Sequence, residues 1–166
     1  MSLKNFRCAL FGAFILFIVS CTVEDSDAVT TNNTPIVSTF NYSSLELETM
    51  SLINSHRLSI GLNALETIDH VSYISEDHDE YMIENNVVNH NNFEARSSSI
   101  IQTLGAKNVS ENIAYNYNSA QGVFDAWLKS DGHKKNMEGD FTHFGIAVRE
   151  NPVTNKKYYT NIFVKI

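Results

Sequence analysis

Three polar side chains in this sequence are of types that could do chemistry together: His90 in "VVNHNNF", Glu111 in "SENIA" and His133 in "SDGH". Each lies beside a turn or at the edge of a predicted element. Neutral imidazoles bind divalent metals, and a nearby carboxylate can orient them or act as a general base. This combination is compatible with a metal site formed by His90 and His133, with Glu111 as the candidate base. Histidines in surface loops would give the same pattern, so the residues alone leave both interpretations open.

The other histidines fit structural roles better. His78 falls on the apolar stripe of a predicted helix and is expected to pack in the core. His56 follows the stripe of the first predicted helix less cleanly and is also expected to be structural. His70 begins a helix, where we expect it to cap the helix or to face solvent. His143 fits the rim of a cleft and a packing role equally well.

Several familiar catalytic motifs are missing from the sequence. It has no glycine-rich phosphate loop, no His-Glu-x-x-His and no Gly-x-Ser-x-Gly, which excludes the P-loop NTPases, zincins and α/β-hydrolases. Ser130 lies near His133, but a shared loop does not establish the hydrogen bond that a serine nucleophile needs. The formal net charge of −7 argues against nucleic acid as a partner, because an acidic surface repels phosphates.

The elements that would position these residues are predicted from periodicity and capping signals. Ser43 and Glu46 have the spacing of a capping box, which predicts a helix that begins there and ends near Gly61. Further helices are predicted over residues 69–86, over 98–104 and from Ser119 onward, with extended segments over 110–116, 144–150 and 157–166. Helices followed by a terminal hairpin indicate an α+β layered domain rather than alternating βαβ units.

The N-terminus is typical of an exported protein. Two basic residues in "MSLKNFR" precede the apolar run "CALFGAFILFIVS", which is short for a stable transmembrane helix. The run leads into "IVSC", which resembles a bacterial lipobox, where a peptidase cuts before a cysteine that then carries lipid. We expect a lipoprotein signal peptide over residues 1–20, lipid on Cys21 and a lipidated flexible tether over residues 21–40. The alternative is an ordinary secretory signal with a coincidental cysteine.

One globular domain is expected over residues 41–166, because this length suffices for a single core but not for two. The chain has two cysteines, Cys8 and Cys21, and cleavage before Cys21 would leave only an acylated one. No disulfide is therefore expected, in spite of an exported location. The predicted location is the bacterial cell envelope, outside the cytoplasm, on the outer membrane or the cell surface. The lipid would make the membrane itself a partner.

Three segments, taken in order, resemble the CAP superfamily of cysteine-rich secretory proteins, antigen 5 and pathogenesis-related proteins. They are "INSHRLSIGLNAL", "SENIAYNYNSAQGVFDAWLKSDGHKKNM" and "FTHFGIAV". The combination of Glu-Asn-Ile-Ala, Trp-x-x-Ser-x-Gly-His-x-x-Asn and Phe-Thr-x-x-Gly is specific. The resemblance covers residues 44–166 and points to a bacterial, disulfide-free branch. It implies an α+β fold, namely a three-layer α-β-α sandwich with a central, mostly antiparallel sheet.

The resemblance also implies a cleft lined by two histidines and two acids. The histidines fall on His90 and His133, and the first acid falls on Glu111. The second acid would follow Trp127 by three positions, where this chain has Ser130. Serine supplies no second charge, so weaker metal binding is expected. The implied function is the binding of a small ligand, a lipid or a divalent metal such as zinc. The alternative is a metal-assisted or general-base hydrolase of the cell envelope, with Glu111 as its base.

Overall fold

The computed structural model describes residues 36–166 of the chain. The predicted signal peptide, the proposed lipidation site Cys21 and most of the predicted tether lie outside the described residues. Within residues 36–166, none of the helices combines the length and the apolar composition that crossing a membrane requires.

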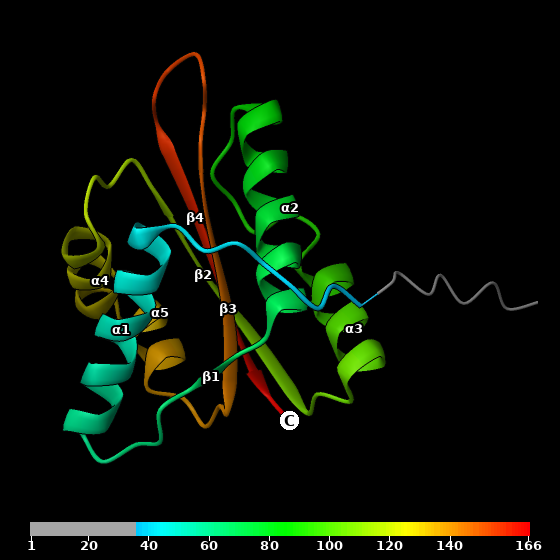
Figure 1. Ribbon diagram of the computed structural model, residues 1–166, viewed down its shortest axis with the longest axis vertical. Helices are drawn as coiled ribbons and strands as arrows, with labels where there is room; N and C mark the ends of the chain where they lie inside the picture. Colours follow the sequence, from blue (N-terminus) through cyan, green and yellow to red (C-terminus); the bar gives the residue numbers. More distant parts are fainter. Residues whose placement is uncertain (1–35) are drawn as a thin grey trace, which may run out of the picture. The chain divides into compact units, whose positions relative to one another are not determined.

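The central element is a four-stranded sheet in the order β1-β3-β4-β2 (Figure 1). β1 (Glu66–Thr67) pairs in parallel with β3 (His143–Glu150). β4 (Lys157–Lys165) pairs antiparallel with β3 and with β2 (Asn108–Tyr115). The terminal hairpin agrees with the prediction. β2 lies at an edge of the sheet, so that side chains from both helical layers can meet around it.

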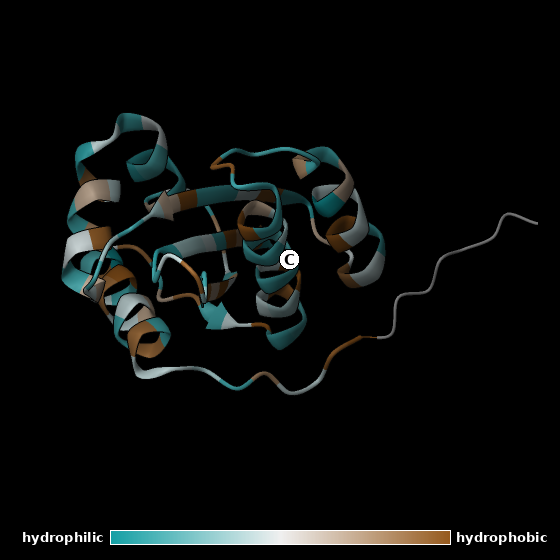
Figure 2. Cartoon of the chain, turned by 90° about the horizontal axis from the view of Figure 1, so that it is seen from above, coloured by the Kyte–Doolittle hydropathy of each residue, from teal (hydrophilic) through white to brown (hydrophobic). Residues whose placement is uncertain are grey.

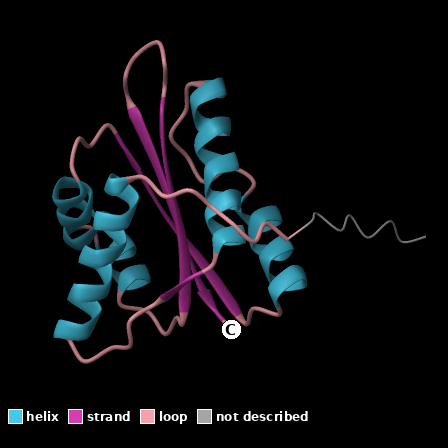
Figure 3. Ribbon diagram, viewed as in Figure 1, coloured by secondary structure: helices cyan, strands magenta, loops and turns pink. Residues whose placement is uncertain are grey.

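Helices cover both faces of this sheet (Figure 3). α1 (Ser44–Ser59), α4 (Ala120–Lys129) and α5 (Asp131–Met137) lie on one face, and α2 (Asp69–Asn85) and α3 (Phe93–Leu104) lie on the other. Seen from above, the sheet runs between the two helical layers (Figure 2). The predicted three-layer sandwich with a mostly antiparallel sheet is confirmed.

Alternate residues of β4 contribute to different cores. Tyr159 and Phe163 pack with Trp127 of α4 in the core beneath α1, α4 and α5. Ile162 and Val164 point the other way and pack beneath α2 and α3. This follows from the period of two along a strand. Every second residue of β2 also faces α2 and α3. This alternation decides which polar side chains of β2 enter the candidate site.

Two helices begin where the capping signals place them. The Ser43 hydroxyl accepts a hydrogen bond from the Glu46 backbone N–H, and the Glu46 carboxylate accepts one from the Ser43 N–H. The capping box of α1 is therefore present as predicted. Ser119 caps α4 by accepting a bond from the Gly122 N–H. These local hydrogen bonds satisfy backbone donors that have no partner within the helix.

Two other boundaries differ from the prediction. α3 begins at Phe93, not at residue 98, and α5 forms over a segment for which no helix was predicted. Asn is a common residue at helix starts, but Asn92 leads into α3 in a left-handed conformation and its side chain does not cap the helix. α5 is short and polar, and it lacks the apolar periodicity on which a helix prediction depends. Both missed segments border the candidate site.

The last residues of the predicted tether contact the domain. Residues 36–42 cross the N-terminal end of α2 (Figure 1). The Val37 N–H donates to His70 Nδ1 at 3.3 Å, and the Phe40 N–H donates to Asp69 Oδ2 at 3.2 Å. The ordered contacts of the domain thus begin before residue 41, where the sequence placed its start.

α2 lies very close to the sheet at Gly145 of β3. A side-chain carbon added at Gly145 would collide with the backbone of Val71 and Ser72, so the absence of a Cβ allows this approach. The close packing buries the inner face of α2, including His78 and Asp79, against the strands. α2 thereby carries titratable side chains into the interior beside β2.

Candidate functional site

Glu111 on β2 is the centre of the candidate site. It pairs across the strands with Ile162, so its side chain faces α2 and α3, and it is only 1% exposed. Its Oε1 accepts hydrogen bonds from His90 Nδ1 and Arg96 Nη2, both at 2.8 Å. Its Oε2 accepts from Arg96 Nε at 3.0 Å. The guanidinium therefore binds both carboxylate oxygens in a bidentate geometry.

These partners determine the protonation state of Glu111. Burial alone would raise the pKa of this carboxyl group. The hydrogen bond from His90 and the positive charge of Arg96 act in the opposite direction, and the net pKa of Glu111 is lowered from its ordinary value. The carboxylate is therefore ionised at neutral pH, with its charge balanced by a buried ion pair.

His90 lies in the loop between α2 and α3, with its side chain 49% exposed. Because Glu111 is ionised, His90 Nδ1 carries the proton of their 2.8 Å hydrogen bond. Nε2 is then the nitrogen with a free lone pair when the imidazole is neutral. A histidine held by a carboxylate through one nitrogen is the arrangement found around most metal-binding histidines.

His133 reaches the same region from the opposite helical layer. It lies on α5, which is tied to β2 because Asn112 Nδ2 donates to the His133 carbonyl at 3.0 Å. Asn136 Nδ2 donates to the Glu111 carbonyl at 3.1 Å. Burial lowers the pKa of the His133 imidazole, and the charge of His90 lowers it further. His133 is therefore neutral at physiological pH, and no hydrogen bond within the described residues links its imidazole to His90 or Glu111.

Ser130 occupies the junction between α4 and α5. Its backbone N–H donates to the Trp127 carbonyl, and its own carbonyl accepts from the Lys134 N–H at 2.8 Å. Its side chain does not cap α5. Ser130 thus precedes His133 by one helical turn, but no hydrogen bond within the described residues links its hydroxyl to His90, Glu111 or His133.

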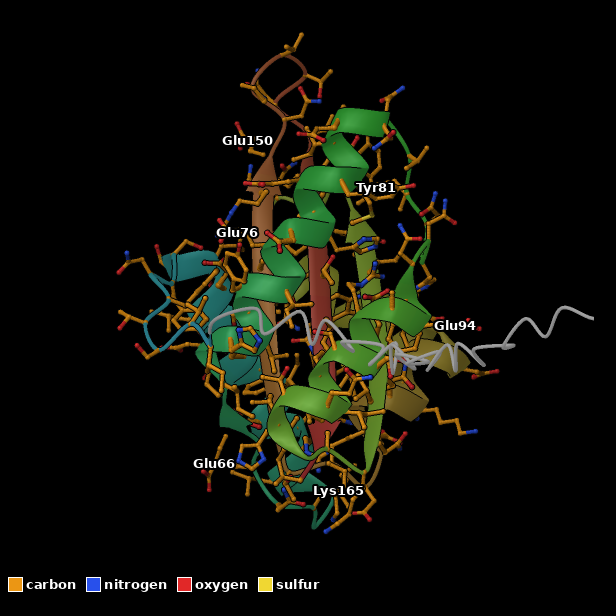
Figure 4. The ribbon with its side chains drawn as sticks, turned by 90° about the vertical axis from the view of Figure 1, so that its right-hand side faces the viewer. Glu66, Glu76, Tyr81, Glu94, Glu150 and Lys165 are labelled. Atoms are coloured by element: carbon orange, nitrogen blue, oxygen red, sulfur yellow. The ribbon has the colours of Figure 1, made fainter. Side chains whose placement is uncertain are left out.

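A shallow hollow of about 560 Å³ opens beside His90. It is lined by the loop and the first turn of α3, that is, by His90, Asn91, Asn92, Phe93, Glu94 and Ala95. Figure 4 places Tyr81 on α2 and Glu94 on α3, the two helices that this loop connects. The hollow gives solutes access to the exposed side of His90.

Of the remaining histidines, His78 lies next to the site, with its Nε2 4.0 Å from Glu111 Oε1, and the other three lie elsewhere in the domain. His78 is buried as predicted, and His56 has a structural contact with Glu138, Nε2 to Oε1, at 2.8 Å. The expectation that His70 caps a helix or faces solvent is wrong, because it is 1% exposed and accepts a bond from Val37. His143 on β3 contacts Thr142 at 2.8 Å. Across residues 36–166, no three side chains of His, Cys, Asp or Glu gather as a metal-binding group.

Sequence reasoning missed Arg96. Its partner Glu111 lies on another element, 15 residues further along the chain, so no local motif links the two. One signal was available: Arg96 precedes the buried Ile100 by four residues, which places both on the same face of α3. An arginine on an inward face requires a buried acceptor, and Glu111 supplies it.

Known proteins resemble this chain in sequence. The model of the cysteine-rich secretory protein family, CAP, matches residues 50–164. The uncharacterized membrane protein YlbC of Bacillus subtilis is 33% identical over 126 residues, which cover 72% of this chain and 34% of YlbC. The chain thus spans about a third of the length of this curated relative.

Solved structures resemble the fold at lower identity. An outer surface protein from Borrelia burgdorferi has a TM-score of 0.64 at 19% identity, covering 78% of this chain and 98% of that protein. An extracellular protein with an SCP domain from Bacillus anthracis has a TM-score of 0.64 at 22% identity, covering 77% of this chain and 45% of that chain. The similar proteins thus include an outer surface protein, an extracellular protein and a membrane protein. With a family model that spans most of the domain, the chain belongs to the cysteine-rich secretory protein (CAP) family.

Proposed function

We propose that this protein is an extracytoplasmic binding module, anchored to a bacterial envelope by lipid on Cys21, in which His90 and His133 bind a divalent metal such as zinc. One observation carries the proposal. The half-exposed His90 imidazole is oriented by a hydrogen bond to the buried carboxylate of Glu111. An imidazole held in this way has one fixed nitrogen and one that is free to coordinate a metal.

The residues fit a weak metal site. A metal needs neutral imidazoles, and burial together with the charge of His90 keeps the pKa of His133 low. Glu111 would serve as the orienting group of His90 and not as a ligand, because both of its oxygens already accept hydrogen bonds. Two histidines leave the other coordination positions to water or to a donor group of a small ligand.

The residue types around the hollow suit a metal or a small polar ligand. Among its six lining residues, only Phe93 and Ala95 are apolar, and the others are His, Asn and Glu. A polar ligand would find donors and acceptors on the loop.

Hydrolysis with Glu111 as the base receives less support from the geometry. A general base needs an oxygen free to take a proton from water or substrate, and a pKa near the working pH. The oxygens of Glu111 are held by Arg96 and His90, and its pKa is lowered. Both features lower the basicity of the carboxylate.

Zinc titration tests the proposed site. Asn33 to Ile166 form one compact unit, so a soluble chain that begins at residue 22 retains the whole domain and omits Cys21. We expect calorimetry to show one equivalent of zinc bound to this chain. Binding should weaken in His90→Ala and in His133→Ala, and disappear in the double variant. These expectations follow from removing one or both imidazole donors.

A matched control is His143→Ala, which removes a histidine from β3 outside the candidate site. It should bind zinc like the unmodified chain. If zinc were instead held at scattered surface histidines, this change would also reduce the amount of zinc bound. The proposal fails if the unmodified chain takes up no stoichiometric zinc, or if the double variant of His90 and His133 binds as before.

The lipid anchor has a separate test. Expressed from the full-length chain, the protein should sediment with membranes and incorporate labelled fatty acid. Cys21→Ala should abolish the label, because the thiol that would carry the lipid is gone. Cys8→Ala is the control and should keep the label, since residue 8 lies in the segment removed by the predicted cleavage. A label that persists in Cys21→Ala would refute the anchor at this position.

A further inference from the structure

The loop that carries His90 is held from the protein interior by His78. The His78 imidazole is 2% exposed and lies parallel to the Tyr81 ring, with centroids 5.8 Å apart. Its Nε2 lies 2.8 Å from the carbonyl oxygen of Asn89, the residue that precedes His90. A carbonyl can only accept, so Nε2 carries the proton and donates. His78 Nδ1 has no partner, which makes the bond to the loop the one hydrogen bond of this imidazole within the described residues.

Arg96 holds the other side of the same loop. Its Nη1 donates to the carbonyl of Asn91, the residue that follows His90, at 2.6 Å. The remaining guanidinium nitrogens bind Glu111, which accepts the hydrogen bond from His90 Nδ1. One side chain thus fixes both the backbone beside His90 and the carboxylate that orients its ring.

The loop adds further hydrogen bonds of its own. The Asn91 N–H donates to Asn89 Oδ1 at 3.0 Å, and Asn91 Nδ2 donates to the Tyr81 hydroxyl at 3.1 Å. The Phe93 N–H donates to the His90 carbonyl at 3.0 Å. His90 is thus an exposed imidazole on a segment whose backbone groups are bound on both sides. Such an arrangement reduces the conformational freedom that a ligand would otherwise have to remove.

We infer that His78 and Arg96 are positioning residues that set the tautomer of His90, so that Nε2 of His90 is the atom offered to a ligand. This inference rests on the proposed binding function of the site. By fixing the carbonyls of Asn89 and Asn91, they keep the His90 ring where Nδ1 meets Glu111. A loop that moved away would break this hydrogen bond and leave both nitrogens of His90 free to carry the proton.

Two variants of His78 separate positioning from packing. His78→Leu fills the space but leaves the Asn89 carbonyl unpaired, whereas His78→Gln keeps an amide donor that can reach it. The soluble chain from residue 22 is labelled with ¹⁵N, and imidazole spectra recorded at one fixed pH identify the His90 tautomer. Zinc affinity is measured on the same samples by calorimetry.

In the unmodified chain, we expect His90 to carry its proton on Nδ1. His78→Leu should give a mixture of His90 tautomers and weaken zinc binding about 10-fold, the lower end of the effect of removing a group that orients a metal ligand. His78→Gln should retain the single tautomer and an affinity within about threefold of the original, because its amide can replace the donated hydrogen bond. A folded His78→Leu chain with an unchanged tautomer and affinity would overturn the inference.

Arg96→Lys keeps the inference testable if His78→Leu does not fold. Lysine retains the positive charge beside Glu111, but it cannot form the bidentate pair and also reach Asn91. This variant should therefore give a mixture of His90 tautomers. An unchanged tautomer in this variant would count against positioning by Arg96. If the unmodified chain binds no zinc, the proposed function fails, while the tautomer measurement still decides whether His78 and Arg96 position the ring.

Discussion

Replacing Arg96 by leucine should lower the free energy of unfolding by about 3–5 kcal/mol, as expected when one partner of a buried ion pair is removed. The Glu111 side chain is 1% exposed and depends on Arg96 for two of its hydrogen bonds. Without the guanidinium, a buried carboxylate keeps only the bond from His90. Urea denaturation of the soluble chain at neutral pH measures the change.

The pH dependence of the stability of Arg96→Leu tests whether the unpaired carboxylate of Glu111 causes the loss of stability. In Arg96→Leu the pKa of Glu111 should rise, because burial then acts without the opposing charge. A group whose folded pKa is raised stabilises the fold below its unfolded pKa, and this contribution is lost as pH rises. The stability deficit of the variant should therefore be smaller in mild acid than at neutral pH.

The double variant Arg96→Leu/Glu111→Leu provides the matched control. It removes both charges, and replacing a buried ion pair by apolar side chains is often close to neutral. We expect it to recover most of the lost stability, although it cannot restore zinc binding, because His90 loses its orienting carboxylate. An Arg96→Leu chain within about 1 kcal/mol of the original would show that the ion pair has no such structural role.

The parts of the fold that depend on local signals were predictable from the sequence. The spacing of Ser43 and Glu46 located the start of α1, and Ser119 located the start of α4, because a capping side chain binds backbone within its own turn. The three-layer architecture followed from the motifs of the family and not from periodicity. The strand order β1-β3-β4-β2 depends on contacts between distant segments, which one sequence does not display.

The candidate site was also only partly predictable from the sequence. His90 and Glu111 were singled out as polar side chains beside turns or at the edges of predicted elements, and the structure joins them by a hydrogen bond. The ion pair of Glu111 could not be inferred, because it depends on Arg96, which belongs to the five residues of α3 that precede the predicted start of this helix. His78 was recognised as buried, but its bond to Asn89 required the course of the loop.

A second titratable group lies on the buried face of α2. Asp79 is fully buried, and its Oδ1 accepts a hydrogen bond from Thr160 Oγ1 at 2.6 Å, while its Oδ2 has no partner among the described residues. Burial raises the pKa of this carboxyl group well above its ordinary value. The bond from Thr160 and the charge of Arg149 oppose the rise, and the charges of Glu46 and Glu111 add to it. The folded protein therefore retains a proton that the unfolded chain releases.

Replacing Asp79 by asparagine should stabilise the protein at neutral pH. Because its folded pKa is raised, Asp79 supports the fold fully below the unfolded pKa, and this support is lost as pH rises toward the folded pKa. One such group can lower the free energy of unfolding by up to about 1.4 kcal/mol per pH unit, or by about 2.7 kcal/mol from about pH 5 to pH 7. Asparagine keeps the acceptor for Thr160 and cannot ionise, so this loss should be absent.

Unfolding free energies measured across this pH range give the result as a difference between two curves. The stability of Asp79→Asn relative to the original chain should grow steadily with pH, and the two should converge in acid, where the unfolded Asp79 is also protonated. Asp125→Asn on α4 is the control, since its carboxylate accepts a bond from Gln121 near the surface. Its curve should follow that of the original chain. Parallel curves for Asp79→Asn and the original chain would mean that Asp79 is ionised in the fold, with its charge stabilised by Arg149.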